Sequence, residues 1–143
     1  SACIIPDVPL EEEALFKEPL RGEGIVLIRL VPLTASLERL EDLSNEAEGF
    51  LYAVTVNGIT GEKAELEYRY LQERVEYLKG LTKVPIYAGF GISNSKTANV
   101  LLAFCDGIIV GSKIVNALHK KDKEEIKGFV RGVKRSSEAP FVF

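Results

Sequence analysis

Glycines follow apolar segments at three places along the chain, and such positions could bind an anion through the backbone. The glycine-bearing segments are 57–61 (NGITG), 89–93 (GFGIS) and 111–113 (GSK). Glycine lets a ligand approach the backbone closely, and the first N–H groups of a helix are unpaired donors that attract anions. Together these segments predict a phosphate site formed by Gly61, Gly91, Gly111 and Ser112. For a single glycine, the alternative is that it only turns the chain.

Two aromatic residues and one acid could contribute to the same site. Phe90 lies between two glycines, where it could form the wall of an apolar ligand pocket. Tyr52 lies inside an apolar run, so its side chain points either to a ligand or to a helix. Asp7 follows another apolar run, between Pro6 and Pro9. That position suits a catalytic or partner-contact residue, or an acid that stabilises a turn.

The usual sets of catalytic or metal-binding residues are absent from the sequence. It contains no Ser-His-Asp arrangement, nucleophile elbow, Walker loop or dinucleotide-binding GxGxxG motif. No metal site is expected, because Cys3, Cys105 and the single histidine, His119, are scattered along the chain. The cysteines are predicted to be reduced thiols of a cytoplasmic protein, and His119 to lie at the end of a helix.

Short apolar runs separated by amphipathic segments must position these residues. The runs are typical of strands buried on both faces of a parallel sheet. The predicted strands are residues 3–5, 25–31, 50–55, 84–88 and 107–110. The predicted helices are residues 10–18, 36–47, 65–79, 95–104 and 122–134.

Capping and stop signals bound several of these helices. Ser36 is a predicted N-cap, and Asp122 with Glu125 resembles a capping box. Pro19 is expected to end the first helix and Gly80 the third.

Strands that alternate with helices indicate βαβ units. A complete (β/α)8 barrel needs about 250 residues. The 143 residues supply four strands and the tip of a fifth, with no linker between them. We therefore predict an α/β fold, in which residues 1–143 form one partial TIM-barrel domain.

The composition argues against several classes of partner. Lys plus Arg number 18 and Asp plus Glu number 21, so the net charge is −3 at pH 7. No basic run points to a nucleic acid or an anionic membrane surface, and no apolar run approaches the roughly 20 residues of a membrane span. The sequence has no Met and opens inside a strand-like run. We expect it to be a fragment, or a chain processed from a longer one.

Five segments resemble the tryptophan synthase alpha subunit family in their order and spacing. They are residues 4–12 (IIPDVPLEE), 31–34 (VPLT), 52–61 (YAVTVNGITG), 89–93 (GFGIS) and 106–115 (DGIIVGSKIV). They are similar to the regions at the ends of the fourth to eighth strands of that family's barrel. The resemblance therefore implies the C-terminal half of a TIM (β/α)8 barrel, from the end of strand 4 through helix 8.

The resemblance also implies an activity and a set of site residues. The family is a lyase of tryptophan biosynthesis that cleaves indole-3-glycerol phosphate to indole and glyceraldehyde 3-phosphate by general acid–base catalysis. Indole then passes to a beta subunit in a cytoplasmic α2β2 heterotetramer. The resemblance assigns Gly61, Gly91, Gly111 and Ser112 to the substrate phosphate, Ile4, Leu30, Tyr52 and Phe90 to the indole pocket, and Asp7 and Pro9 to the beta-subunit interface. Residues 56–62 correspond to a closing lid.

Two departures from the family limit what this chain can do. The family's catalytic Glu and Asp belong to the N-terminal half of the barrel, so no residue here matches either. Val56 stands where the lid commonly holds Arg. We therefore expect the chain alone to be inactive. No cofactor is expected in this chain, because pyridoxal phosphate would belong to the beta subunit.

Two other functions stay open at the level of sequence. The chain could be a non-catalytic phosphate-binding module, in which two half barrels pair through their open sheet edges. It could also be another phosphate-binding TIM-barrel enzyme, an isomerase or epimerase, although residues 7–9 and 57–61 resemble the alpha subunit specifically. An isolated half barrel is expected to be marginally stable unless it self-associates.

Overall fold

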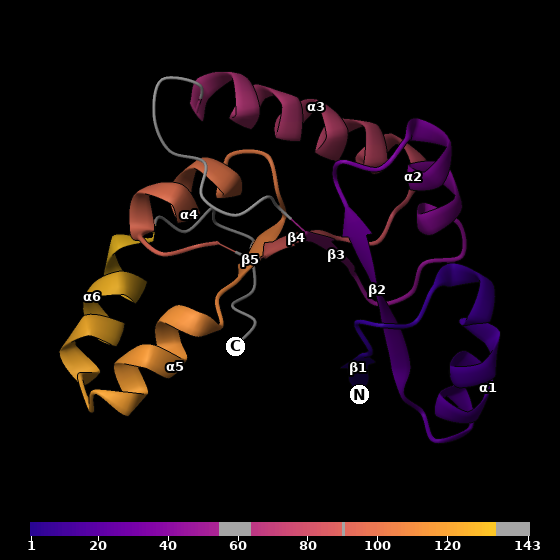
Figure 1. The fold of residues 1–143 in the computed structure, drawn as a ribbon, viewed down its shortest axis with the longest axis horizontal. Helices are drawn as coiled ribbons and strands as arrows, with labels where there is room; N and C mark the ends of the chain where they lie inside the picture. Colours follow the sequence, from indigo (N-terminus) through magenta and orange to yellow (C-terminus); the bar gives the residue numbers. More distant parts are fainter. Residues whose placement is uncertain (55–63, 90, 134–143) are drawn as a thin grey trace.

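Five parallel strands follow one another across a single sheet in sequence order (Figure 1). The computed structural model describes residues 1–54, 64–89 and 91–133. The strands are β1 (Ala2–Ile4), β2 (Val26–Pro32), β3 (Leu51–Val54), β4 (Ile86–Gly89) and β5 (Gly107–Ile109). Each lies within two residues of its predicted place. The sheet is half of a (β/α)8 barrel, which confirms the predicted fold class.

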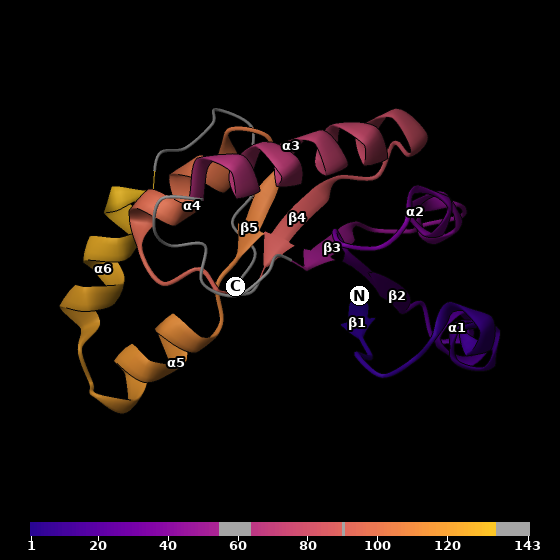
Figure 2. The ribbon, with the colours of Figure 1, turned by 45° about the horizontal axis from the view of Figure 1, so that its top comes forward.

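Helices cover one face of this sheet. They are α1 (Ala14–Gly22), α2 (Leu37–Ser44), α3 (Ala64–Leu81), α4 (Ser95–Leu102), α5 (Ser112–His119) and α6 (Lys123–Gly132), with a short 3-10 helix, η1 (Leu10–Glu12). Figure 2 shows them as an arc around the strands, with the other side of the sheet left open. We call the covered side the outer face and the open side the inner face. In the part of the chain that the structure describes, no helix is long and apolar enough to cross a membrane.

The core lies between the outer face and the helices. Alternate strand residues point outward and are buried there, including Val31, Leu51, Ala53, Ile86 and Ala88. They pack against buried helix residues, including Leu40, Leu71, Val75, Leu78 and Leu101. Because successive side chains of a strand point to opposite faces, the intervening residues lie on the inner face, where a ligand could reach them.

Two predicted N-caps are confirmed. The Ser36 hydroxyl accepts a hydrogen bond from the Arg39 N–H at 3.2 Å. The Asp122 carboxylate accepts one from the Glu125 N–H at 2.8 Å. Both side chains satisfy donors that a helix start leaves unpaired.

Two predicted helix ends are wrong. Helix α1 continues through Pro19 to Gly22. Proline removes the hydrogen bond to the carbonyl of Leu15, and its ring crowds that carbonyl. Leu15 is 71% exposed, so its carbonyl can tilt outward and water can replace the missing donor. Helix α3 continues through Gly80 to Leu81, and Gly80 does not adopt the positive φ of a glycine helix stop.

Candidate functional site

A cavity of about 600 Å³ opens where β4 and β5 end. Its lining is Tyr52, Gly91, Ile92, Ser93, Ile109, Val110, Gly111, Ser112, Lys113, Asn116, Lys120 and Glu125. The structure thus brings together four residues predicted from the sequence: Tyr52, Gly91, Gly111 and Ser112. The carboxyl ends of parallel strands are where ligands bind in α/β proteins.

Helix α5 begins at this cavity, and its start is uncapped. Gly111 is its N-cap residue and has no side chain that could cap the helix, and the first N–H groups of a helix have no partner within the helix. The φ of Gly111 is −103°, which other residues also adopt, and a Cβ there would meet no atom of the described residues within 4 Å. Gly91 has a φ of +70°, in the left-handed region that favours glycine. The turn alternative therefore explains glycine at 91 but not at 111, where glycine leaves open space beside the helix start.

Charged side chains line the same cavity from three positions. Lys113 is the second residue of α5, Lys120 follows its last residue, and Glu125 lies in the first turn of α6. The Lys113 Nζ lies 2.8 Å from the Glu125 Oε1 and 5.7 Å from the centre of the Phe129 ring. None of these three residues was predicted from the sequence as a ligand-binding residue, although a lysine directly after a Gly-Ser helix start was a usable signal.

Tyr52 points to the inner face rather than to a helix. Its ring lies over Gly89 of β4, where an added Cβ would overlap it. Burial raises the pKa of the Tyr52 hydroxyl, so the group stays protonated near neutral pH and can donate a hydrogen bond. Tyr52 therefore gives the cavity an aromatic wall with a polar end.

The other predicted pocket residues on β1 and β2 share this face but do not line the cavity. Leu30 is the register partner of Tyr52. It lines a second cavity of about 220 Å³, between β2 and the segment that follows β1. Ile4 pairs with Ile28 of β2 and is 39% exposed. Of the residues predicted for the apolar pocket, Ile4, Leu30 and Tyr52 therefore lie along the inner face, and Tyr52 lies beside Gly91 and Gly111.

Asp7 and Pro9 lie in an exposed segment between β1 and η1. Pro9 immediately precedes η1, and its carbonyl accepts a hydrogen bond from the Glu12 N–H at 3.0 Å. The predicted partner-facing residues are thus accessible and held at the start of a short helix.

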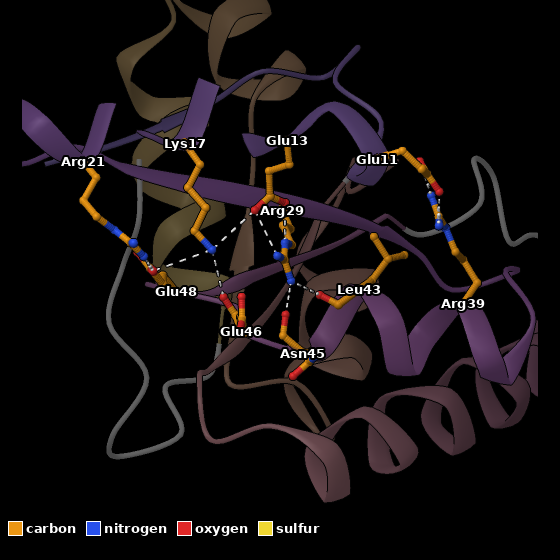
Figure 3. Close-up of polar contacts among 10 residues, drawn as sticks. All are labelled: Glu11, Glu13, Lys17, Arg21, Arg29, Arg39, Leu43, Asn45, Glu46 and Glu48. Atoms are coloured by element: carbon orange, nitrogen blue, oxygen red, sulfur yellow. Dashed lines mark hydrogen bonds and ion pairs between the residues drawn. The ribbon is translucent and has the colours of Figure 1, made fainter. Parts of the chain in front are cut away.

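A buried ion pair anchors the segment that follows Pro9. Glu13 is 7% exposed, and its carboxylate accepts two hydrogen bonds from Arg29 of β2, one at 2.9 Å (Figure 3). Arg29 also donates to the carbonyls of Leu43, at 3.1 Å, and Asn45. Burial alone would raise the pKa of Glu13, but the hydrogen bonds and charge of Arg29, with help from Lys17, outweigh it and lower the pKa.

Further ion pairs flank this one along α1 (Figure 3). Lys17 lies 3.5 Å from Glu13 and 3.7 Å from Glu48, and Glu48 also pairs with Arg21. The cluster joins α1 and β2 to the segment between α2 and β3. It is a structural support on the outer face, and it was not predicted from the sequence.

Gly61, Phe90 and residues 56–62 lie outside the described residues, so their predicted roles stay predictions. Cys3 is half-buried and Cys105 is buried, and neither forms a disulfide. Within residues 1–54, 64–89 and 91–133, no group of three or more His, Cys, Asp or Glu side chains could hold a metal ion.

Comparison with known proteins identifies the family. The sequence model of the family described as "Tryptophan synthase alpha chain" matches residues 1–139. The chain belongs to the tryptophan synthase alpha chain family. This membership favours the resemblance over the isomerase or epimerase alternative.

Relatives of this family are about twice as long as the chain. This chain is 44% identical to the tryptophan synthase alpha chain of Listeria monocytogenes serotype 4a over 128 residues. The aligned residues cover 90% of this chain and 49% of the Listeria chain. The solved alpha subunit from Campylobacter jejuni superposes with a TM-score of 0.81 at 32% identity, over 93% of this chain and 53% of that one. A tryptophan synthase α2β2 structure from Pyrococcus furiosus shares the fold with a TM-score of 0.71 at 23% identity, over 92% of this chain and 52% of that one. The chain therefore spans about half the length of the tryptophan synthase alpha chains it matches.

Proposed function

We propose that this chain supplies the phosphate site and part of the indole pocket of an enzyme that cleaves indole-3-glycerol phosphate. The products are indole and glyceraldehyde 3-phosphate, in tryptophan biosynthesis. The observation that carries the proposal is the cavity that joins Tyr52 to Gly91, Gly111 and Ser112. An uncapped helix start suits a phosphate group, and an aromatic wall suits an indole ring.

The chain's own share of the reaction is binding and orientation. Carbon–carbon cleavage of this substrate needs a general acid and a general base. Among the described residues that line the cavity, Glu125 is the carboxylate, and it is paired with Lys113. The catalytic Glu and Asp of the family match no residue of this chain. We therefore assign them to the other half of the barrel and expect no cleavage by this chain alone.

The proposed partner is a tryptophan synthase beta subunit, in a cytoplasmic α2β2 assembly. The exposed segment with Asp7 and Pro9 offers a surface for it. The α2β2 composition of the Pyrococcus furiosus enzyme is a precedent within the family. Pyridoxal phosphate belongs to the beta subunit in this proposal, and this chain carries no cofactor of its own.

The test is a fusion of two half barrels. The half of the Listeria monocytogenes chain that this chain does not cover is placed before residue 1, and indole release is measured with the parent enzyme as reference. We expect the fusion to release indole and the purified chain alone to release none. Release by the chain alone, in proportion to its concentration, would show that the catalytic groups lie within it. A fusion that melts cooperatively but releases no indole would contradict the proposed activity.

A non-catalytic module is the second candidate, and the open sheet favours it. Within the described residues, β1 and β5 form the two edges of the sheet, and each has a strand partner on one side. Two copies that paired through these edges could bind phosphorylated ligands without chemistry. Binding of a phosphate ester by a chain that stays inactive in the fusion would support this candidate.

A further inference from the structure

We propose that Lys113 is an anion-binding residue of the cavity, and that Glu125 is an internal counter-ion that an alkyl phosphate monoester displaces. The inference rests on the proposed phosphate site and concerns its regulation and affinity. Lys113 lies in the first turn of α5, where a cation is electrostatically unfavourable.

The start of α5 carries only positive charge of its own. The aligned peptide dipoles place a partial positive charge at a helix N-terminus. Lys113 adds an ammonium group in that turn, which contains no acid. A lysine at this position is therefore stabilised by a nearby anion. Water could solvate the ammonium group in place of an anion, but the Lys113 side chain is only 20% exposed and is partly shielded from water.

Glu125 supplies that anion from another helix. Its Oε1 lies 2.8 Å from the Lys113 Nζ, and both residues line the cavity. The contact fixes one of the three ammonium donors, and within the described residues the other two N–H groups have no hydrogen-bond partner, so they can face a ligand. A phosphate dianion bound at the start of α5 would be attracted by the Lys113 ammonium group and repelled by the Glu125 carboxylate.

Glu125 can release Lys113 at low cost. In a capping box, the side chain at this helix position would bond to the backbone N–H of the N-cap residue. Here the Asp122 N–H instead donates to the Ala117 carbonyl at 2.9 Å, so the Glu125 carboxylate is directed to Lys113. After release, Glu125 would still lie in the first turn of α6, where the helix dipole stabilises an acid.

The test is calorimetric titration of the whole chain with glycerol 3-phosphate at low ionic strength. For Lys113→Gln we expect the Kd to rise about tenfold, as the loss of a charged hydrogen bond would cause. For Glu125→Gln we expect the Kd to fall severalfold, because the competing anion is gone. Lys113→Arg keeps the charge and is expected to bind nearly as well as the unmodified chain.

The chain offers a matched control on the same helix. Glu124 and Lys127 form an exposed pair on α6, with 2.6 Å between Oε1 and Nζ, and neither lines the cavity. Glu124→Gln removes the same charge near the same helix start, so it corrects for the general effect of net charge. We expect its Kd to equal that of the unmodified chain.

The opposite changes in Kd expected for Lys113→Gln and Glu125→Gln distinguish this proposal from an ion pair with only a structural role. A pair that only holds α5 against α6 predicts lower melting temperatures for both variants and no tightening by Glu125→Gln, and that result would overturn the proposal. If the unmodified chain and Glu125→Gln both melt cooperatively and neither binds, the phosphate site itself is rejected. If the unmodified chain binds and Glu125→Gln binds equally or more weakly, only the counter-ion role is rejected.

Discussion

The ring of Tyr52 on β3 lies over Gly89 on β4, where an added Cβ would overlap the Tyr52 hydroxyl and the adjoining ring carbons. The two residues lie on the inner face of neighbouring strands, offset along the register because Tyr52 is paired with Tyr87 and Gly89 with Val54. A second contact between a tyrosine ring and a glycine lies one strand along, between Tyr87 and Gly107, which are direct register partners. A Cβ at Gly107 would lie 2.8 Å from the Tyr87 ring. Glycine on one strand thus makes room for tyrosine on the previous one.

We expect Gly89→Ala to destabilise the chain by about 1–3 kcal/mol, the usual cost of overpacking. The same substitution in a Tyr52→Leu background should lower the free energy of unfolding by less, because the ring that the new methyl group would overlap is absent. Urea denaturation of the single and double variants measures this coupling. Gly80→Ala is the control, since a Cβ at this helix position meets no atom and alanine favours a helix. Equal costs in both backgrounds would contradict the assigned contact.

The Glu13–Arg29 pair predicts a loss of stability in acid. The pKa of Glu13 is lower in the folded chain than its ordinary value. Its stabilising contribution is therefore present above the unfolded-state pKa and lost as the pH falls through the lower folded value. Glu13→Gln should cost about 3 kcal/mol at neutral pH, since it leaves Arg29 without its buried partner.

The measurement is the free energy of unfolding of Glu13→Gln and of the unmodified chain over a pH series. The difference between them should shrink toward low pH, where Glu13 itself becomes protonated. Glu11→Gln is the control, because Glu11 pairs with Arg39 at the surface, and exposed pairs contribute little. A difference that stays constant across the series would show that the Glu13 charge does not carry the effect.

The two cysteines should differ in reactivity. Burial raises the pKa of the Cys105 thiol to about 12, so almost none of it is thiolate near neutral pH. Iodoacetamide is therefore expected to modify the half-buried Cys3 first and to reach Cys105 only after unfolding. Peptide mass spectrometry with and without urea tests this order. Rapid modification of Cys105 in the folded chain would contradict the assigned burial.

The strands, and the two glycines Gly91 and Gly111 that line the cavity, could be predicted because their signals are local. Apolar runs mark buried parallel strands, and a Gly-Ser pair after such a run marks a helix start at the ligand-binding end of the sheet. Gly91 and Gly111 follow the fourth and fifth predicted strands, and the carboxyl ends of parallel strands meet at one edge of the sheet, where the cavity lies.

The missed features depend on how separate segments pack. The direction of Tyr52 was open because alternation in a strand does not say which face the helices cover. The Lys113–Glu125 pair joins two helices whose relative placement the sequence does not state. Arg29 gave a partial signal, as a charge inside the apolar run 25–31, but its partner Glu13 could not be chosen among the neighbouring acids. Pro19 was misjudged because the cost of one lost hydrogen bond depends on the exposure of its acceptor.

The open sheet predicts that the isolated chain self-associates. Ile4 on the edge strand β1 is a large apolar side chain that is 39% exposed, and it lies on the inner face. Burial of such side chains between copies is the favourable term for association. We expect gel filtration to give a mass above the 15.8 kDa of one chain, and the melting temperature to rise with protein concentration. Ile4→Glu should shift the chain toward the monomer, whereas Leu15→Glu, on the surface of α1, should not. A well-folded monomer whose melting temperature does not depend on concentration would contradict association through this face and would weaken the module alternative.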